Sequence, residues 1–133
     1  MRFNIVSDTN YETKVSDHVT TQFSARELED WLHFKNYGND LLTIGVVLMC
    51  RNPEHNFKQR IRMDRKDKAL YIDLMLDYNY FVSDITQEDR IKVVANKMMD
   101  EIPPIIKKYK LKDFDVDLFM QDLKKYLKKI KWL

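Results

Sequence analysis

The chain has 133 residues, about the size of one typical domain, so we expect a single domain over residues 1–133. Hydrophobic residues make up 44% and charged residues 33% of the chain, a balance that excludes a disordered protein. The formal net charge of only +2 excludes the strong basic field that draws nucleic acid to a whole domain.

Three features bear on where the protein acts. The opening MRFNIVSDTN contains no long apolar core, so we expect no secretory signal. The longest apolar run, near Leu41–Cys50, falls short of the roughly 20 residues that a membrane-spanning helix needs. Cys50 is the single cysteine, which rules out an intrachain disulfide and favours a reducing compartment. We therefore predict a cytoplasmic protein that no membrane holds.

The first third of the chain predicts a strand and a helix. Phe3–Val6 is short and apolar and is followed by polar turn residues, which is typical of a strand. Residues 8–23 fit either a second strand or a loop. Ser24 and Glu27 have the spacing of a capping box, which predicts the start of a helix. Four apolar residues then recur at helical spacing: Leu28, Trp31, Leu32 and Phe34. The stretch 37–40, which contains Gly38 and Asn39, predicts the end of this helix.

The middle of the chain predicts a buried strand and a hairpin. Leu41–Cys50 is apolar at odd and even positions, as in a strand buried on both faces, and Gly45 within it indicates a bulge or close packing. Residues 57–64 and 70–78 alternate between apolar and polar side chains. A hairpin turn centred on residues 66 and 67 would place residues at equal distances from the turn opposite each other. The predicted pairs are Ile61–Ile72, Met63–Leu70, Arg62–Tyr71 and Arg60–Asp73.

The last third is helical. Thr86 and Asp89 form a second capping box, and apolar residues recur after it at helical spacing as far as Ile102. The prolines at 103 and 104 predict that this helix breaks there or that a new short one begins. Asp113 or Asp115 then caps a final helix with its own apolar stripe.

This order of elements predicts an α+β fold in which helices pack on one face of an antiparallel sheet of about four strands, a two-layer sandwich. The even-numbered residues of 70–78 would face the helices. The other face would be open to solvent, carrying Lys58, Arg60, Arg62, Tyr71, Asp73, Met75 and Asp77.

Most chemical motifs are missing from the sequence. The three histidines are scattered singly and no metal-ligand spacing occurs, so we expect no metal and no cofactor. Asp73 and Asp77 are the best pair of carboxylates for catalysis, but on one strand they would lie about 13 Å apart. That is wider than the carboxylate pairs of glycosidases, and Arg60 opposite Asp73 favours an ion pair over a general acid.

Two surface patches remain as candidates for binding. The first is the open face around Tyr71, Asp73, Met75 and Asp77, with Arg60 and Arg62, because aromatic residues, methionine and arginine are enriched in interfaces. The second is the acidic patch of Glu27, Glu29 and Asp30 on the first helix. Each of them could also be an ordinary solvated surface, since one wet face is normal for an antiparallel sheet.

Three stretches carry a family resemblance: DRKDKALYIDLMLDY, QEDRIKVVANKMMDEI and KLKDFDVDLFMQDLKKYL, within Asp64–Leu127. They resemble the small α+β immunity proteins of bacterial polymorphic toxin systems. The resemblance implies a cytoplasmic antidote without enzyme activity that binds a cognate protein toxin and blocks its active surface. It supplies no site residues. Because inhibitors of nucleases often present carboxylates in place of phosphate, Asp73, Asp77 or the Glu27–Asp30 patch could contact the toxin.

Two other functions stay open at this point. A small nucleic-acid-binding accessory protein would use Arg60, Arg62 and the basic C-terminal helix that ends in KKYLKKIKWL, and its binding would depend on salt. A small hydrolase would need carboxylates from other strands to converge near Asp73.

Overall fold

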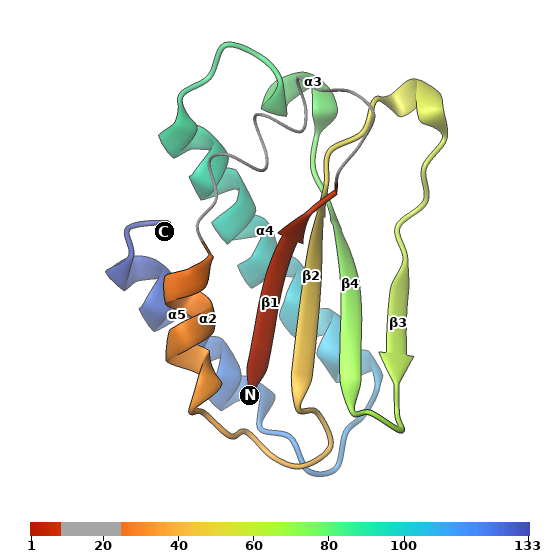
Figure 1. Cartoon of the computed structure of the whole chain (residues 1–133), viewed down its shortest axis with the longest axis vertical. Coiled ribbons are helices and arrows are strands. Elements are labelled where there is room, and N and C mark those ends of the chain that lie inside the picture. Colours follow the sequence, from red (N-terminus) through yellow and green to blue (C-terminus); the bar gives the residue numbers. More distant parts are fainter. Residues whose placement is uncertain (9–24) are drawn as a thin grey trace.

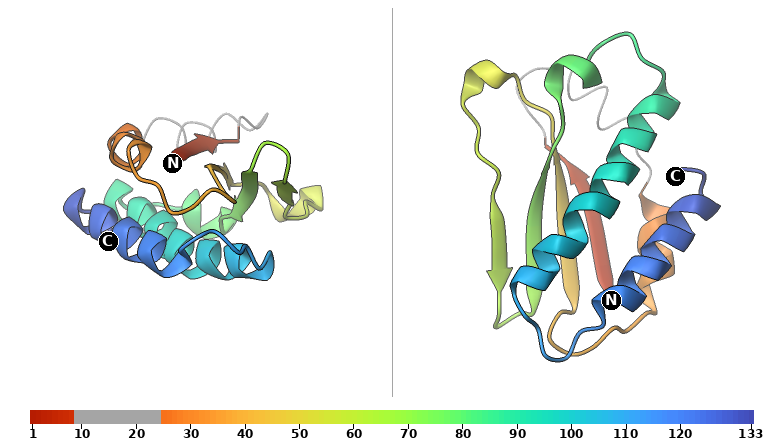
Figure 2. Two further views of the ribbon diagram at one scale, coloured as in Figure 1. Left: turned by 90° about the horizontal axis from the view of Figure 1, so that it is seen from below. Right: turned by 180° about the vertical axis from the view of Figure 1, so that it is seen from behind.

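The computed structural model describes residues 1–8 and 25–133. Within them the chain is an α+β fold in which helices cover one face of an open, four-stranded sheet (Figures 1 and 2). This confirms the predicted fold class. The strands are β1 (Arg2–Ser7), β2 (Thr43–Met49), β3 (Ile61–Asp64) and β4 (Ala69–Met75). The helices are α2 (Arg26–His33), the short 3₁₀ helix η1 (Pro53–His55), α3 (Tyr78–Phe81), α4 (Gln87–Lys108) and α5 (Val116–Lys129).

The sheet is mixed, so the expected antiparallel pairing holds at one edge only. Its strand order is β1-β2-β4-β3, and β1 and β4 both run parallel to the central β2. Only β3 and β4 are antiparallel. Hairpin register is set by a local turn, whereas the direction of strands that are distant in sequence depends on where the crossing segments pack. The apolar run of β2 at odd and even positions is typical of a parallel strand, but it does not by itself identify which strands lie beside it.

The β3–β4 hairpin has the predicted register. Ile61 lies opposite Ile72, Arg62 opposite Tyr71 and Met63 opposite Leu70. The regular ladder is shorter than the alternating sequence, because β3 begins at Ile61 and β4 ends at Met75. The even-numbered residues of β4 are buried against the helices, as predicted: Leu70, Ile72 and Leu74.

Helices α4 and α5 lie side by side on the buried face of the sheet, and α2 lies against β1 (Figure 2). Helix α4 starts at the predicted capping box, in which the Asp89 N–H donates to Thr86 Oγ1 at 3.1 Å. It then continues through Pro103 and Pro104, where a break was expected. The neighbouring residues Ile102, Ile105 and Ile106 are buried, and this packing outweighs the backbone hydrogen bonds that the prolines cannot donate.

The start and end of α2 differ from the prediction. Ala25 precedes the helix and provides no side-chain hydrogen bond, so the expected capping box does not begin it; Ser24 lies outside the described residues, as does the ambiguous stretch up to residue 23. The helix ends at His33, which leaves Phe34 90% exposed rather than on the apolar face. Trp31 is half-buried and its ring centroid lies 5.1 Å from that of Tyr126 on α5.

Tyr37 connects the loop after α2 to helix α5. Its side chain is buried against the Phe119 ring, and its hydroxyl donates a hydrogen bond of 2.6 Å to Asp122. Burial raises the pKa of Tyr37 far above its ordinary value of 10.0, and the hydrogen bond to Asp122 raises it further. The neutral phenol is therefore the form that the folded protein holds.

We expect stability to depend on Tyr37 at alkaline pH. An unfolded tyrosine loses its proton as the pH rises through about 10, whereas folded Tyr37 keeps it, so its contribution is complete below pH 10 and is lost above it. Tyr37→Phe should lower the free energy of unfolding by about 1 kcal/mol near pH 8. This difference should shrink by up to about 1.4 kcal/mol per pH unit above 10, measured by urea unfolding. A difference that stays constant up to pH 11 would contradict the assignment.

Candidate functional site

Tyr71 stands at the centre of the open face of the sheet. On the neighbouring strand β2 it faces Gly45, where an added Cβ would lie only 2.9 Å from Cδ1 of the tyrosine ring. The glycine therefore leaves the space in which the ring packs, and the sequence prediction of close packing at Gly45 is confirmed. On its other side the Arg62 guanidinium lies 4.8 Å from the ring centroid, within the range of a cation–π contact. Tyr71 remains 38% exposed.

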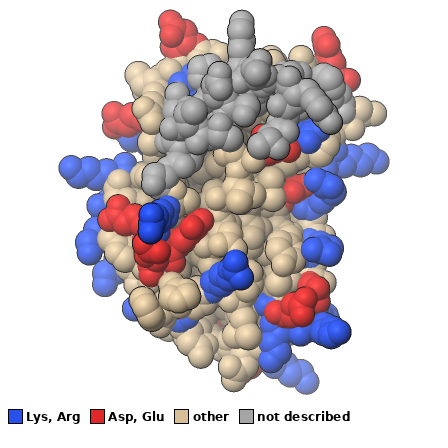
Figure 3. All heavy atoms as spheres, viewed as in Figure 1, with Lys and Arg blue, Asp and Glu red and all other residues tan. Residues whose placement is uncertain are grey.

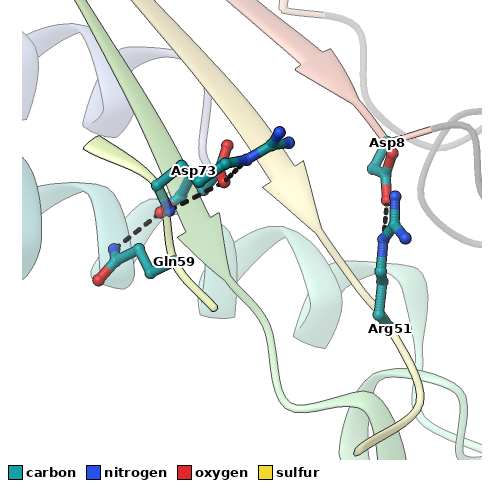
Figure 4. Close-up of polar contacts among 5 residues, drawn as sticks. Asp8, Arg51, Gln59 and Asp73 are labelled. Carbon is teal, nitrogen blue, oxygen red and sulfur yellow. Dashed lines mark hydrogen bonds and ion pairs between the residues drawn. The ribbon is translucent and has the colours of Figure 1, made fainter. Parts of the chain in front are cut away.

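Asp73 and Arg60 form the predicted ion pair, but Asp73 is not exposed. The side chain of Asp73 is only 8% accessible to solvent, whereas that of Arg60 is 72% accessible. One carboxylate oxygen of Asp73 accepts hydrogen bonds from the Arg60 backbone N–H at 3.0 Å and from its Nε at 3.1 Å. Gln59 donates to the Asp73 carbonyl at 2.8 Å (Figure 4). Asp73 thus holds Arg60 in place, and the exposed group is the arginine.

The side chains of Arg60, Arg62, Tyr71 and Asp73 line a hollow of about 370 Å³. The face around it is largely uncharged towards β2, and basic side chains gather on the side of β3 (Figure 3). Three partly or largely exposed apolar side chains also lie on this face, one each from β1, β2 and β4: Val6, Val47 and Met75. The hairpin register predicted from the sequence had already placed the four residues that line the hollow next to one another: Arg62 beside Tyr71 and Arg60 beside Asp73.

Asp77 does not belong to the strand. β4 ends at Met75, and Asp77 caps helix α3 instead, its Oδ1 accepting from the Tyr80 N–H at 3.3 Å. Asp77 and Met75 line a separate hollow of about 330 Å³ beyond the end of the strand. The two aspartates are therefore used in different ways, one to hold an arginine and one to start a helix.

Phe57 is a part of the face that the sequence did not single out. The Arg51 guanidinium lies 4.0 Å above its ring centroid and that of Arg60 lies 5.6 Å away. Arg51 also forms an ion pair of 2.5 Å with Asp8 at the end of β1 (Figure 4). Each of the two rings, Phe57 and Tyr71, therefore has at least one arginine guanidinium against it.

The acidic patch on α2 is partly used within the fold. Glu29 accepts a hydrogen bond of 2.9 Å from the Ile5 N–H, which lies on the outer edge of β1. Asp30 lies 4.0 Å from Arg26, and both side chains are largely exposed. Glu27 is exposed. Glu29 therefore satisfies a backbone group of an edge strand, which is a structural role.

The lysines of α5 lie on the far side of the sheet from this face, because α5 packs on the buried face (Figure 2). Lys129 lies 4.6 Å from the ring centroid of Trp31. These lysines and Arg62 do not form one continuous basic surface.

In residues 1–8 and 25–133, no cluster of three or more histidine, cysteine, aspartate or glutamate side chains could hold a metal ion. None of the helices in the described part of the chain is long and apolar enough to span a membrane.

A family model described as immunity protein 44 matches residues 1–129. No curated protein and no solved structure matches the chain.

Proposed function

Because the chain belongs to the immunity protein 44 family, we propose that it binds and neutralises a cognate toxin of a polymorphic toxin system. In this proposal the chain acts as one domain in the cytoplasm and blocks the active surface of the toxin without catalysis. The observation that carries the proposed binding site is the hollow formed by Tyr71 and two arginines on the open face of the sheet.

The side chains around this hollow are held by contacts within the chain itself. Asp73 fixes Arg60 through Nε, and the Tyr71 ring lies between Gly45 and Arg62. Tyrosine and arginine are the residues that most often dominate interface energies, and side chains that are already ordered lose less entropy on binding. The face therefore has the composition of an interface centre, and its side chains contact one another within the chain.

The charge of the face suggests what the toxin presents. Arg60 and Arg62 are exposed, whereas Asp73 is buried and Asp77 caps a helix. We therefore propose direct toxin contacts by Tyr71, Arg60, Arg62 and Met75, with Asp73 acting as a positioning residue for Arg60. Such a surface is complementary to an acidic patch on the toxin rather than to a phosphate-binding cleft.

The test is neutralisation of the toxin encoded beside the gene. We expect Tyr71→Ala to weaken toxin binding by about 2 kcal/mol, or roughly thirtyfold, because truncation removes a central interface residue. Arg62→Ala should weaken it as well, and the double variant should fail to protect cells that express the toxin. Binding is measured by calorimetry, and urea unfolding checks that each variant is folded.

Tyr80→Ala is the matched control, because Tyr80 on α3 is 45% exposed but lies away from the hollow. It should protect as well as the unmodified protein. Equal losses for Tyr71→Ala and Tyr80→Ala, or full protection by the double variant, would remove the open face from the proposal.

Nucleic acid is not part of the proposal. The accessory-protein alternative needs Arg60, Arg62 and the lysines of α5 on one surface, but the lysines of α5 lie on the other side of the sheet. Binding to DNA or RNA that weakens steeply with salt and is lost in Arg62→Ala would favour the accessory-protein alternative instead.

A further inference from the structure

A second hollow, of about 240 Å³, lies at the turn end of the β3–β4 hairpin. Three segments that are distant in sequence meet there: the loop before β2, the hairpin and the loop between α4 and α5. Its lining consists of Asp40, Met63, Arg65, Lys68, Lys110, Leu111 and Lys112. We call this set the hairpin pocket.

The hairpin pocket carries an excess of positive charge. Four of its lining residues are basic and one, Asp40, is acidic. The Asp40 carboxylate already has a partner within the fold, because its Oδ2 accepts a hydrogen bond of 2.8 Å from the Asp113 N–H. Among the residues that the structure describes, none of the four basic side chains has an ion-pair partner, whereas the nearby Lys107 pairs with Asp117 at 3.9 Å.

The backbone beneath these cations is fixed. Lys68 and Lys110 both have left-handed backbone angles, with φ of 54° and 48°, which are uncommon for lysine. The Lys68 carbonyl accepts hydrogen bonds from the N–H groups of Leu42 and Thr43 at 2.8 and 3.2 Å. The Lys110 N–H donates to the Lys107 carbonyl at 3.2 Å. Both lysines therefore project from tight, closed turns.

The pocket also contains apolar surface. Met63 and Leu111 are half-buried and lie among the cations. No aromatic ring lines the pocket on which a nucleobase could stack. Charged groups around apolar side chains suit the carboxylates and methylene groups of aspartate and glutamate better than they suit a bare phosphate.

We propose that the hairpin pocket binds an acidic segment of a protein partner. The pocket and the hollow at Tyr71 both include residues of the same hairpin and both are lined by arginine side chains. Figure 3 shows basic side chains on this side of the molecule with an acidic group between them. A partner that covers the open face can therefore place an acidic loop over the hairpin end. That this partner is the toxin rests on the proposed function; the preference for an acidic peptide does not.

The first test uses hexaglutamate as the probe and needs no toxin. At low salt, amide signals of Met63, Lys68 and the segment 110–112 should shift on titration in a nitrogen-15 NMR experiment. Lys110→Glu together with Lys112→Glu should weaken the binding of hexaglutamate about tenfold or more, because two attractive charges become repulsive. The control is Lys124→Glu with Lys125→Glu, which changes the net charge equally at exposed positions of α5. It should retain affinity within about twofold.

Three outcomes would overturn the proposal. Shifts spread over all basic surfaces would show general attraction, and so would equal losses in the two double variants. Tighter binding of inorganic phosphate or a short DNA duplex at the same signals would replace the acidic peptide with another ligand.

A second measurement separates this inference from the proposed function. Protection against the toxin should fall in the Lys110→Glu and Lys112→Glu variant. If it stays complete while Tyr71→Ala loses it, the proposed function stands and the pocket has no part in toxin binding. If neither variant changes protection but hexaglutamate binds the pocket, the pocket stands and the open face fails.

Discussion

Arg90→Met is expected to lower the free energy of unfolding by about 3 to 5 kcal/mol. Arg90 is 4% exposed, and its guanidinium donates to three backbone carbonyls between α3 and α4. The acceptors are Phe81 at 2.7 Å, Ser83 at 2.7 Å and Ile85 at 3.0 Å. Methionine fills a similar volume but donates nothing, so all three carbonyls lose the hydrogen bond from Arg90, and Ser83 keeps only its bond from the Ile85 N–H at 2.8 Å among the backbone bonds that the structure gives it. The measurement is urea unfolding followed by circular dichroism.

Two further variants show whether the three hydrogen bonds are the cause. Arg90→Lys keeps the charge but cannot reach all three carbonyls at once, so it should recover less than half of the loss. Lys92→Met removes an exposed cation two residues later, which pairs with Glu88 on the same helix, and should cost at most about 0.5 kcal/mol. A loss for Arg90→Met no larger than that for Lys92→Met would contradict the structural role of Arg90.

Gly38→Ala is expected to have a comparable effect, about 3 kcal/mol, through the backbone alone. Gly38 has a φ of +136°, a conformation that favours glycine. A Cβ there would lie 2.2 Å from the Asp113 carbonyl oxygen and 2.6 Å from its carbon. The two loops at this point are joined by further hydrogen bonds, including Asp40 N–H to the Asp113 carbonyl at 3.0 Å. The added Cβ would therefore push the loop at Gly38 away from the loop at Asp113, and the hydrogen bonds that join these two loops would be lost with it.

The control for Gly38→Ala is Gly45→Ala. Its Cβ would approach the Tyr71 ring at 2.9 Å, but a side chain on an open face can rotate away. Gly45→Ala should therefore cost roughly 1 kcal/mol and should shift the NMR signals of the Tyr71 ring. Equal destabilisation by the two alanines, measured from the midpoints of urea unfolding, would contradict this account.

Where neighbouring segments determine the structure, the sequence predicted it well. The turn at residues 66 and 67 fixed the register of the hairpin, and the register in turn placed Arg60 beside Asp73. The buried faces of α4 and α5 followed from helical spacing in the same way, with Met98 and Leu123 among the buried residues. Each of these predictions depends on residues that are close in the chain.

Predictions failed where distant contacts decide. The pairing direction of β1 and β2 depends on how α2 packs, and the continuation of α4 through Pro103 depends on burial against the sheet. At the candidate site the sequence treated Asp77 as a strand residue, although the spacing to Tyr80 also fits a helix cap. Arg90 was not singled out, yet it lies one helical turn before Val94 on the buried face, and a charged residue at such a position is a usable signal.

The order of strands in the sheet has a consequence for how the chain folds. β3 and β4 are neighbours in sequence and α4 precedes α5 directly, so these contacts close short loops. β1 is different, because its first residue pairs with Thr43 and its strand partner among the described residues is β2. During synthesis β1 leaves the ribosome well before the strand it pairs with. The backbone groups of β1 therefore cannot form their sheet hydrogen bonds until β2 has been synthesised, and β1 joins the edge of the sheet only then.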